Sequence, residues 1–169
     1  MIEFCRPVRL DTIGSGPTAR AIDASPVECA ALARRFDLLT LESLAADLTA
    51  QRIAGGITLT GRVRAHGNQS CVVSGLPVPF AIEETLALRF DPASGAADEV
   101  ELTDADLDVL PLEGDAVDFG EAAAQALSLA LDPYPKAGAS ELAEYRRLLT
   151  SEEEAARAAN PFSILASED

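Results

Sequence analysis

The chain has 169 residues and a formal net charge of −15; 48% of its residues are apolar, and its aromatic residues are two Tyr and six Phe. The apolar content excludes a disordered chain, and the length fits one domain with a tail. No apolar stretch approaches the roughly 18 residues that a membrane span requires.

The cysteines and the histidine are too few and too scattered for a four-ligand structural zinc site. The sequence contains Cys5, Cys29, Cys71 and a single histidine, His66. An odd number of cysteines without a signal peptide predicts reduced thiols in a cytoplasmic protein.

The charge is divided unevenly along the chain. Residues 1–75 contain eight Arg and seven Asp or Glu, a net of +1, whereas residues 76–169 contain five Lys or Arg and 21 Asp or Glu, a net of −16. The acidic half disfavours broad nucleic-acid binding, so we expect no DNA partner, and any RNA contact would be local and in the first half. The acidic half would suit a basic partner, but it would equally well serve solubility alone.

The N-terminal third predicts two short strands and a helix. Alternating apolar residues around Pro7 indicate an edge strand, and residues 19–24 indicate a second short strand. Ser25-Pro26-Val27-Glu28 is a capping box that starts a helix running to about Phe36. Its apolar face carries Cys29, Leu32, Ala33 and Phe36, and Arg34 and Arg35 lie off that face.

Residues 38–53 fit either a strand or a helix, and we favour a strand because Gly55-Gly56 then turns the chain into the next strand. From Ile57 to Val73 the apolar residues fall on odd numbers, and from Val78 to Phe90 they fall on even numbers. Two runs of period two joined by Ser74–Pro77 predict a long antiparallel hairpin. Gly67-Asn68 fits a hairpin turn or a bend within one long strand, and we favour the bend.

The second half predicts an acidic connector followed by a helix. Residues 98–121 contain ten acidic side chains without the spacing of an EF-hand, so we interpret them as a solvated connector. Asp118 resembles an N-cap for a helix over 119–131 that packs on the buried face of the sheet, and Asp132–Pro135 ends it. Further helices are expected over 140–149 and 151–159.

These elements predict an α+β fold. We expect a bent antiparallel β-sheet or partial barrel, packed by two main helices, in a domain over residues 1–136. We expect residues 137–169 to form an acidic, partly helical C-terminal tail. The sequence contains no P-loop, no G-x-G-x-x-G and no G-x-S-x-G, and we expect no enzyme activity, metal or cofactor.

Three sequence segments carry a family resemblance. The first is Gly61-x-x-x-Ala65-x-x-x-Gln69-x-Cys71-Val72-Val73, followed by Pro77-Val78. The second is Leu110-Pro111-Leu112-Glu113-Gly114-Asp115-x-Val117-Asp118-Phe119-Gly120-Glu121, leading to Leu129-Ala130-Leu131 and Pro133-Tyr134-Pro135-Lys136. The third is Asn160-Pro161-Phe162-x-x-Leu165. In order and spacing, over about residues 20–165, they resemble the YceD family of large ribosomal RNA subunit accumulation proteins, in its alphaproteobacterial form.

The resemblance implies a cytosolic factor needed for normal accumulation of 23S rRNA, with no established chemical activity. Plant relatives act in chloroplast 23S rRNA maturation, and the family's genes often neighbour one for a large-subunit ribosomal protein. Many members carry a second cysteine three positions after the first, but Ser74 occupies that place here.

Two candidate binding sites follow. The polar strand face could bind rRNA or a ribosomal protein, with the nearby arginines contributing if the first helix packs alongside; it comprises Arg62, Arg64, His66, Asn68, Gln69, Arg34 and Arg35. An ordinary solvated strand face explains the same pattern equally well. A short apolar motif in the charged tail could dock onto a partner; it comprises Asn160, Pro161, Phe162 and Leu165. Cys71 falls on the apolar register, which favours a buried structural thiol over a reactive one.

Overall fold

The computed structural model describes residues 3–91, 108–112 and 114–148, and it has the predicted α+β fold. A short 3₁₀ helix spans Leu10–Thr12. The other elements in chain order are β1 (Pro7–Arg9), β2 (Thr18–Asp23), α1 (Pro26–Arg35), β3 (Thr40–Ile53), β4 (Gly56–Ser70), β5 (Pro77–Asp91), β6 (Asp108–Pro111), β7 (Ala116–Asp118), α2 (Phe119–Ala130) and α3 (Ala139–Leu148).

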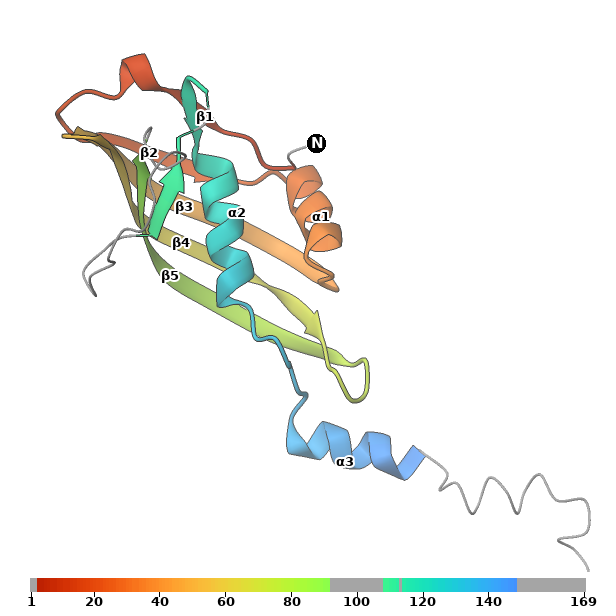
Figure 1. Ribbon diagram of the computed structural model, residues 1–169. Helices are drawn as coiled ribbons and strands as arrows, with labels where there is room; N and C mark the ends of the chain where they lie inside the picture. Colours follow the sequence, from red (N-terminus) through yellow and green to blue (C-terminus); the bar gives the residue numbers. More distant parts are fainter. Residues whose placement is uncertain (1–2, 92–107, 113, 149–169) are drawn as a thin grey trace, which may run out of the picture.

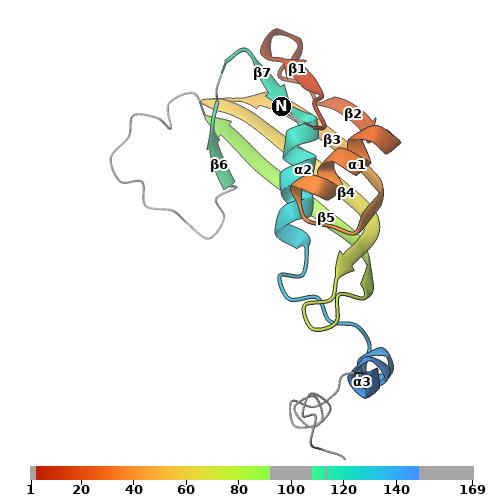
Figure 2. The same cartoon turned by 90° about the vertical axis from the view of Figure 1, so that its right-hand side faces the viewer.

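Five strands form one twisted sheet in the order β2-β3-β4-β5-β6, and β1 pairs with β7 in a separate two-stranded sheet (Figure 1). Strands β2 to β5 are antiparallel neighbours in chain order, whereas β6 runs parallel to the end of β5. Both α1 and α2 lie against the same face of the large sheet (Figure 2). We call the opposite face, on which no helix of the described residues packs, the open face.

The predicted hairpin is confirmed. Strands β4 and β5 pair from Ile57 with Phe90 to Ser70 with Pro77, so Gly67 lies inside one long strand and not in a turn. The ambiguous segment before them is the strand β3, which pairs with β4 through the turn at Gly55. The period-two pattern therefore predicted the three central strands correctly.

Three features differ from the sequence interpretation. Residues assigned to a solvated connector form the short strands β6 and β7, and Leu110 packs against the core. Val73, which continues the apolar register, is exposed because the strand ends at Ser70 and residues 71–76 form the turn. The helix predicted over 151–159 lies outside the described residues.

The first helix is fixed by the capping box that the sequence predicts. The Ser25 side chain accepts from the backbone N–H of Glu28, and the Glu28 carboxylate accepts from the backbone N–H of Ser25. Glu28 also receives two hydrogen bonds from Arg6, at 2.7 and 2.9 Å. Cys29, Leu32 and Ala33 of this helix are buried, as the predicted apolar face requires.

The second helix begins at the predicted cap, Asp118, whose carboxylate accepts from the backbone N–H groups of Gly120 and Glu121. Its apolar face closes the core over β3, β4 and β5. The largest fully buried side chains are Phe4, Phe119, Ile13, Leu32, Leu44, Leu48, Ile57, Leu59, Leu127, Val63 and Val117. The helix predicted near residue 140 is α3, which lies beyond the turn between β4 and β5 (Figure 1).

Replacing Gly67 by alanine tests the close packing of the central strands. A Cβ atom there would lie 2.3 Å from the Thr40 carbonyl oxygen and 2.9 Å from the Phe80 ring. We expect Gly67→Ala to lower the free energy of unfolding by about 2 kcal/mol through overpacking. Denaturant unfolding measures the change, with Gly16→Ala as the matched control because a Cβ at Gly16 meets nothing within 4 Å. Equal stability of the two variants would contradict the close approach.

The Arg6–Glu28 ion pair predicts an acid-dependent stability. Hydrogen bonds from Arg6, and to a smaller extent from the backbone and side chain of Ser25, lower the pKa of Glu28 from 4.5 to about 2. A carboxylate whose pKa falls on folding stabilises the protein above its unfolded pKa and loses that contribution as the pH falls through its folded pKa. Glu28→Gln keeps a capping side chain but removes the charge, so we expect a loss of about 1 kcal/mol at pH 7.

The pH dependence separates this charge effect from a loss of packing. The stability difference between wild type and Glu28→Gln should shrink between pH 4.5 and about 2, as measured by thermal unfolding. A difference that stays constant through this range would rule out the ion pair as its cause.

Candidate functional site

The central strand carries the predicted polar side chains on the open face. Arg62, Arg64 and His66 are exposed, whereas the intervening Val63 and Ala65 are fully buried. This alternation confirms the predicted register of the strand and places the three basic or polar side chains in one row.

Two ion pairs link this row to the neighbouring strands. Arg64 contacts Asp47 of β3 at 2.5 Å, and Arg62 contacts Glu83 of β5 at 3.2 Å. In the strand register Arg62 stands opposite Asp47 and Arg64 stands opposite Glu83, so both ion pairs run diagonally. We call these four residues the charge cluster. All four side chains are about half exposed, so each pair contributes only ~0.2–1 kcal/mol and can exchange its partner at low cost.

The polar row continues towards the end of β4. His66 Nδ1 lies 3.2 Å from the Ser43 hydroxyl, and Asn68 donates to the Thr40 hydroxyl at 2.9 Å. Gln69 instead donates to the Asp132 carbonyl oxygen at 2.8 Å, which ties the strand to the segment after α2. The structure therefore groups His66 and Asn68 with the arginines of the open face, and it gives Gln69 a structural contact.

Arg34 and Arg35 do not join the open face, because α1 packs on the opposite face of the sheet. Arg35 forms two hydrogen bonds with Glu121 of α2, at 2.6 and 2.8 Å, and an ion pair with Glu3. The contact with Glu121 raises the pKa of Arg35, and Arg35 lowers the pKa of Glu121. Arg34 donates to the Ala30 carbonyl oxygen of its own helix. The predicted set of seven residues is thus divided between two faces.

The thiol of Cys71 lies at the turn between β4 and β5. Cys71 is buried, as the sequence predicted, and its Sγ accepts from the Ala137 N–H at 3.3 Å. The Ser74 hydroxyl and then this N–H lower the pKa of Cys71 to about 7, although burial opposes them. By contrast, a hydrogen bond with Asp118 raises the pKa of Cys5, and burial raises the pKa of Cys29.

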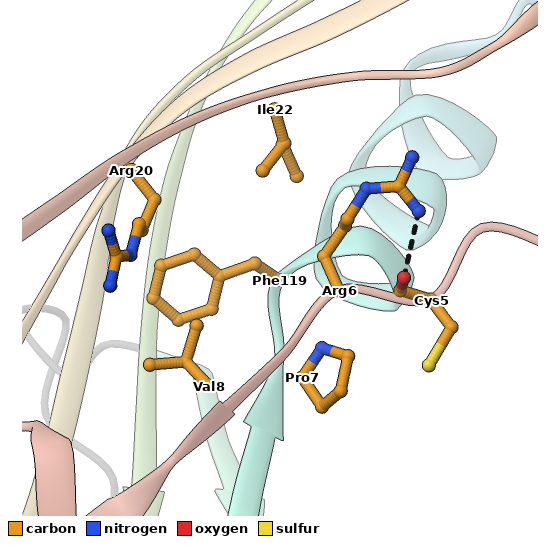
Figure 3. A pocket seen from close by; sticks show the side chains of 7 residues that line it. All are labelled: Cys5, Arg6, Pro7, Val8, Arg20, Ile22 and Phe119. Atoms are coloured by element: carbon orange, nitrogen blue, oxygen red, sulfur yellow. Dashed lines mark hydrogen bonds between the residues drawn. The ribbon is translucent and has the colours of Figure 1, made fainter.

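A pocket of about 280 Å³ lies on the helix side, between β1 and the edge of β2 (Figure 3). Its lining residues are Cys5, Arg6, Pro7, Val8, Arg20, Ile22 and Phe119. The sequence interpretation did not single out Arg20. The alternation of the strand could have identified Arg20. Arg20 and the apolar Ile22 are both even-numbered, so they lie on the same face of β2, the face that packs against the helices.

The predicted docking motif over 160–165 lies outside the described residues. In the described part of the chain, no group of three or more His, Cys, Asp or Glu side chains could hold a metal ion. None of the described helices combines the length and apolar character needed to cross a membrane. Comparisons with protein-family models, curated proteins and solved structures found no match for this chain.

The hydrogen bond from Ser74 predicts how the Cys71 thiol titrates. Alkylation followed against pH by mass spectrometry should show a Cys71 midpoint near pH 7, below the midpoints of Cys5 and Cys29. In Ser74→Ala the largest stabilising contact of the thiolate is lost, so we expect the Cys71 midpoint to rise by about one pH unit. An unchanged midpoint in Ser74→Ala would show that Ser74 does not stabilise the thiolate.

Proposed function

We propose that this protein is a non-enzymatic factor that supports 23S rRNA accumulation and ribosome biogenesis, and that it acts by binding rRNA or a large-subunit ribosomal protein. The resemblance of three segments to the YceD family supports the process. The open face of the sheet supports the mode of action, because it presents polar side chains from three adjacent strands and no helix of the described residues covers them.

The observation that carries the proposal is the charge cluster. Its arginines can leave weak, exposed ion pairs and bind phosphate oxygens bidentately, which suits an RNA backbone. His66 and Asn68 extend the same row and can donate hydrogen bonds to phosphate or base edges. Contacts made by two arginines are local, as the overall charge of −15 requires.

The same cluster supports a second candidate, a protein-interaction module or chaperone for a basic ribosomal protein, without direct RNA contact. Asp47 and Glu83 are exposed and lie on either side of the arginine row, so lysines or arginines of a partner could take the place of Arg62 and Arg64. The 21 acidic residues of the second half of the chain would add a long-range attraction.

Paired variants of the charge cluster distinguish the two candidates. Affinity for a 23S rRNA fragment and for purified large-subunit ribosomal proteins is measured against salt concentration. If RNA is the ligand, Arg62→Ala with Arg64→Ala should weaken binding about tenfold and reduce the salt dependence by about two phosphate contacts. Asp47→Ala with Glu83→Ala should then tighten RNA binding, because these carboxylates no longer compete with the RNA phosphates for Arg62 and Arg64.

If a basic protein is the ligand, the order reverses, and the Asp47 and Glu83 double variant is the one that weakens binding. Arg9→Ala serves as the control in both cases, since it removes an exposed arginine that pairs with Asp11 outside the open face. Binding to neither ligand, or equal binding by all the variants, would refute the assignment of this surface.

A further inference from the structure

The strand β2 has a free edge beside the pocket. In the described residues β2 pairs only with β3, and the Ala24 N–H donates to the Leu44 carbonyl oxygen at 2.9 Å. Since hydrogen-bonded pairs alternate along an antiparallel ladder, Arg20 and Ile22 also bond to β3, whereas Ala19 and Ala21 direct their N–H and C=O groups away from it. The Asp23 carbonyl agrees with this parity, because it accepts from Arg6 across the edge.

The pocket below this edge is apolar, with one exposed positive charge. Figure 3 shows the Phe119 ring lying among Arg20, Ile22 and Val8, with Arg6 to one side. The guanidinium of Arg6 is already held by Glu28 at 2.7 Å. Arg20 has no ion pair or hydrogen-bond partner among the described residues, whereas each of the other arginines whose side chains the structure describes has one.

We propose that the edge of β2 and this pocket form a docking site for an extended, acidic segment of another protein. The segment pairs its main chain with Ala19 and Ala21, places an apolar side chain against the partly exposed Val8 and Ile22 of the pocket, and sets a carboxylate against Arg20. This proposal is independent of the proposed function, which concerns the opposite face of the sheet.

Three observations select this occupant. Outward N–H and C=O groups at alternate residues are the pattern that a bound strand completes. An apolar pocket on the same side takes alternate side chains of that strand, because its residues alternate between two faces as those of β2 do. The unpaired Arg20 favours a carboxylate over an amine. At physiological salt the field of any acidic residue farther than about 8 Å from Arg20 is largely screened.

A capped synthetic heptapeptide is the probe, with threonine at alternate positions and valine, glutamate and valine between them. Its three intervening side chains share one face. Titrated into the full chain and followed by amide NMR, it should shift Ala19 and Ala21 and slow their hydrogen exchange. A peptide with lysine in place of the glutamate should bind about fivefold more weakly, since an exposed charge pair contributes up to ~1 kcal/mol.

Two variants test the two halves of the site. Arg20→Gln should abolish the preference for glutamate over lysine and keep the residual binding. Ala21→Pro should weaken both peptides, because it removes an N–H that points to the edge and leaves the ladder with β3 intact. Lys136→Gln is the matched control, because it removes one positive charge outside the pocket, and it should change neither affinity.

The alternatives give different results. Equal affinity for the two peptides in the wild type, or no shift at Ala19 and Ala21, overturns the proposal. Concentration-dependent shifts without peptide that vanish in Ala21→Pro would assign the edge to a second copy of the chain and also overturn it. Edge amides already protected from exchange in the monomer would mean that the chain covers its own edge, which equally excludes an external segment.

Discussion

The carboxylate of Asp118 joins the N-terminal segment to the start of α2. Its Oδ1 accepts from the backbone N–H groups of Arg6, Gly120 and Glu121, at 2.8, 2.9 and 3.1 Å. One oxygen therefore caps α2 and fixes the strand that leads into β1. The approach is so close that a Cβ at Gly120 would lie 2.2 Å from the Phe4 carbonyl oxygen. Through its side chain Arg6 then reaches Glu28, so the starts of α1 and α2 are both fixed by the same N-terminal segment.

Local signals predicted most of this fold, and non-local pairing accounts for what they missed. The three central strands and both helix caps are encoded by residues within a few positions of each other, so the hairpin and the Ser25 box could be predicted from the sequence. Strands β6 and β7 have only four and three residues, too few for a periodic pattern, and β7 pairs with a segment more than 100 residues earlier. Val73 falls on the same odd numbers as the buried residues of β4 but lies beyond the end of that strand. The alternation of apolar residues does not by itself show where a strand ends.

The candidate surfaces were predictable to the extent that they lie on one strand. Arg62, Arg64 and His66 share a face by parity, and the structure adds Asp47 and Glu83, which only strand register could place beside them. Arg34 and Arg35 were separated from that row because the sequence does not state which face of the sheet a helix covers. Arg20 could have been found from its parity with Ile22, but the pocket beside it depends on β1 and Phe119, which are about 110 residues apart in the sequence.

The chain-order arrangement of β2 to β5 has a consequence for how the protein folds. Strands β3, β4 and β5 are neighbours in sequence as well as in the sheet, so they can pair after short turns close, whereas the contact between Arg6 and Asp118 closes a separation of 112 residues. Contacts between residues close in sequence tend to form first, because closing a long loop of chain costs more conformational entropy. We therefore expect the transition state for folding to contain the central strands and to lack the contact of Asp118 with Arg6, which we call the N-terminal clasp. Weakening the clasp would then speed unfolding and leave the rate of folding nearly unchanged.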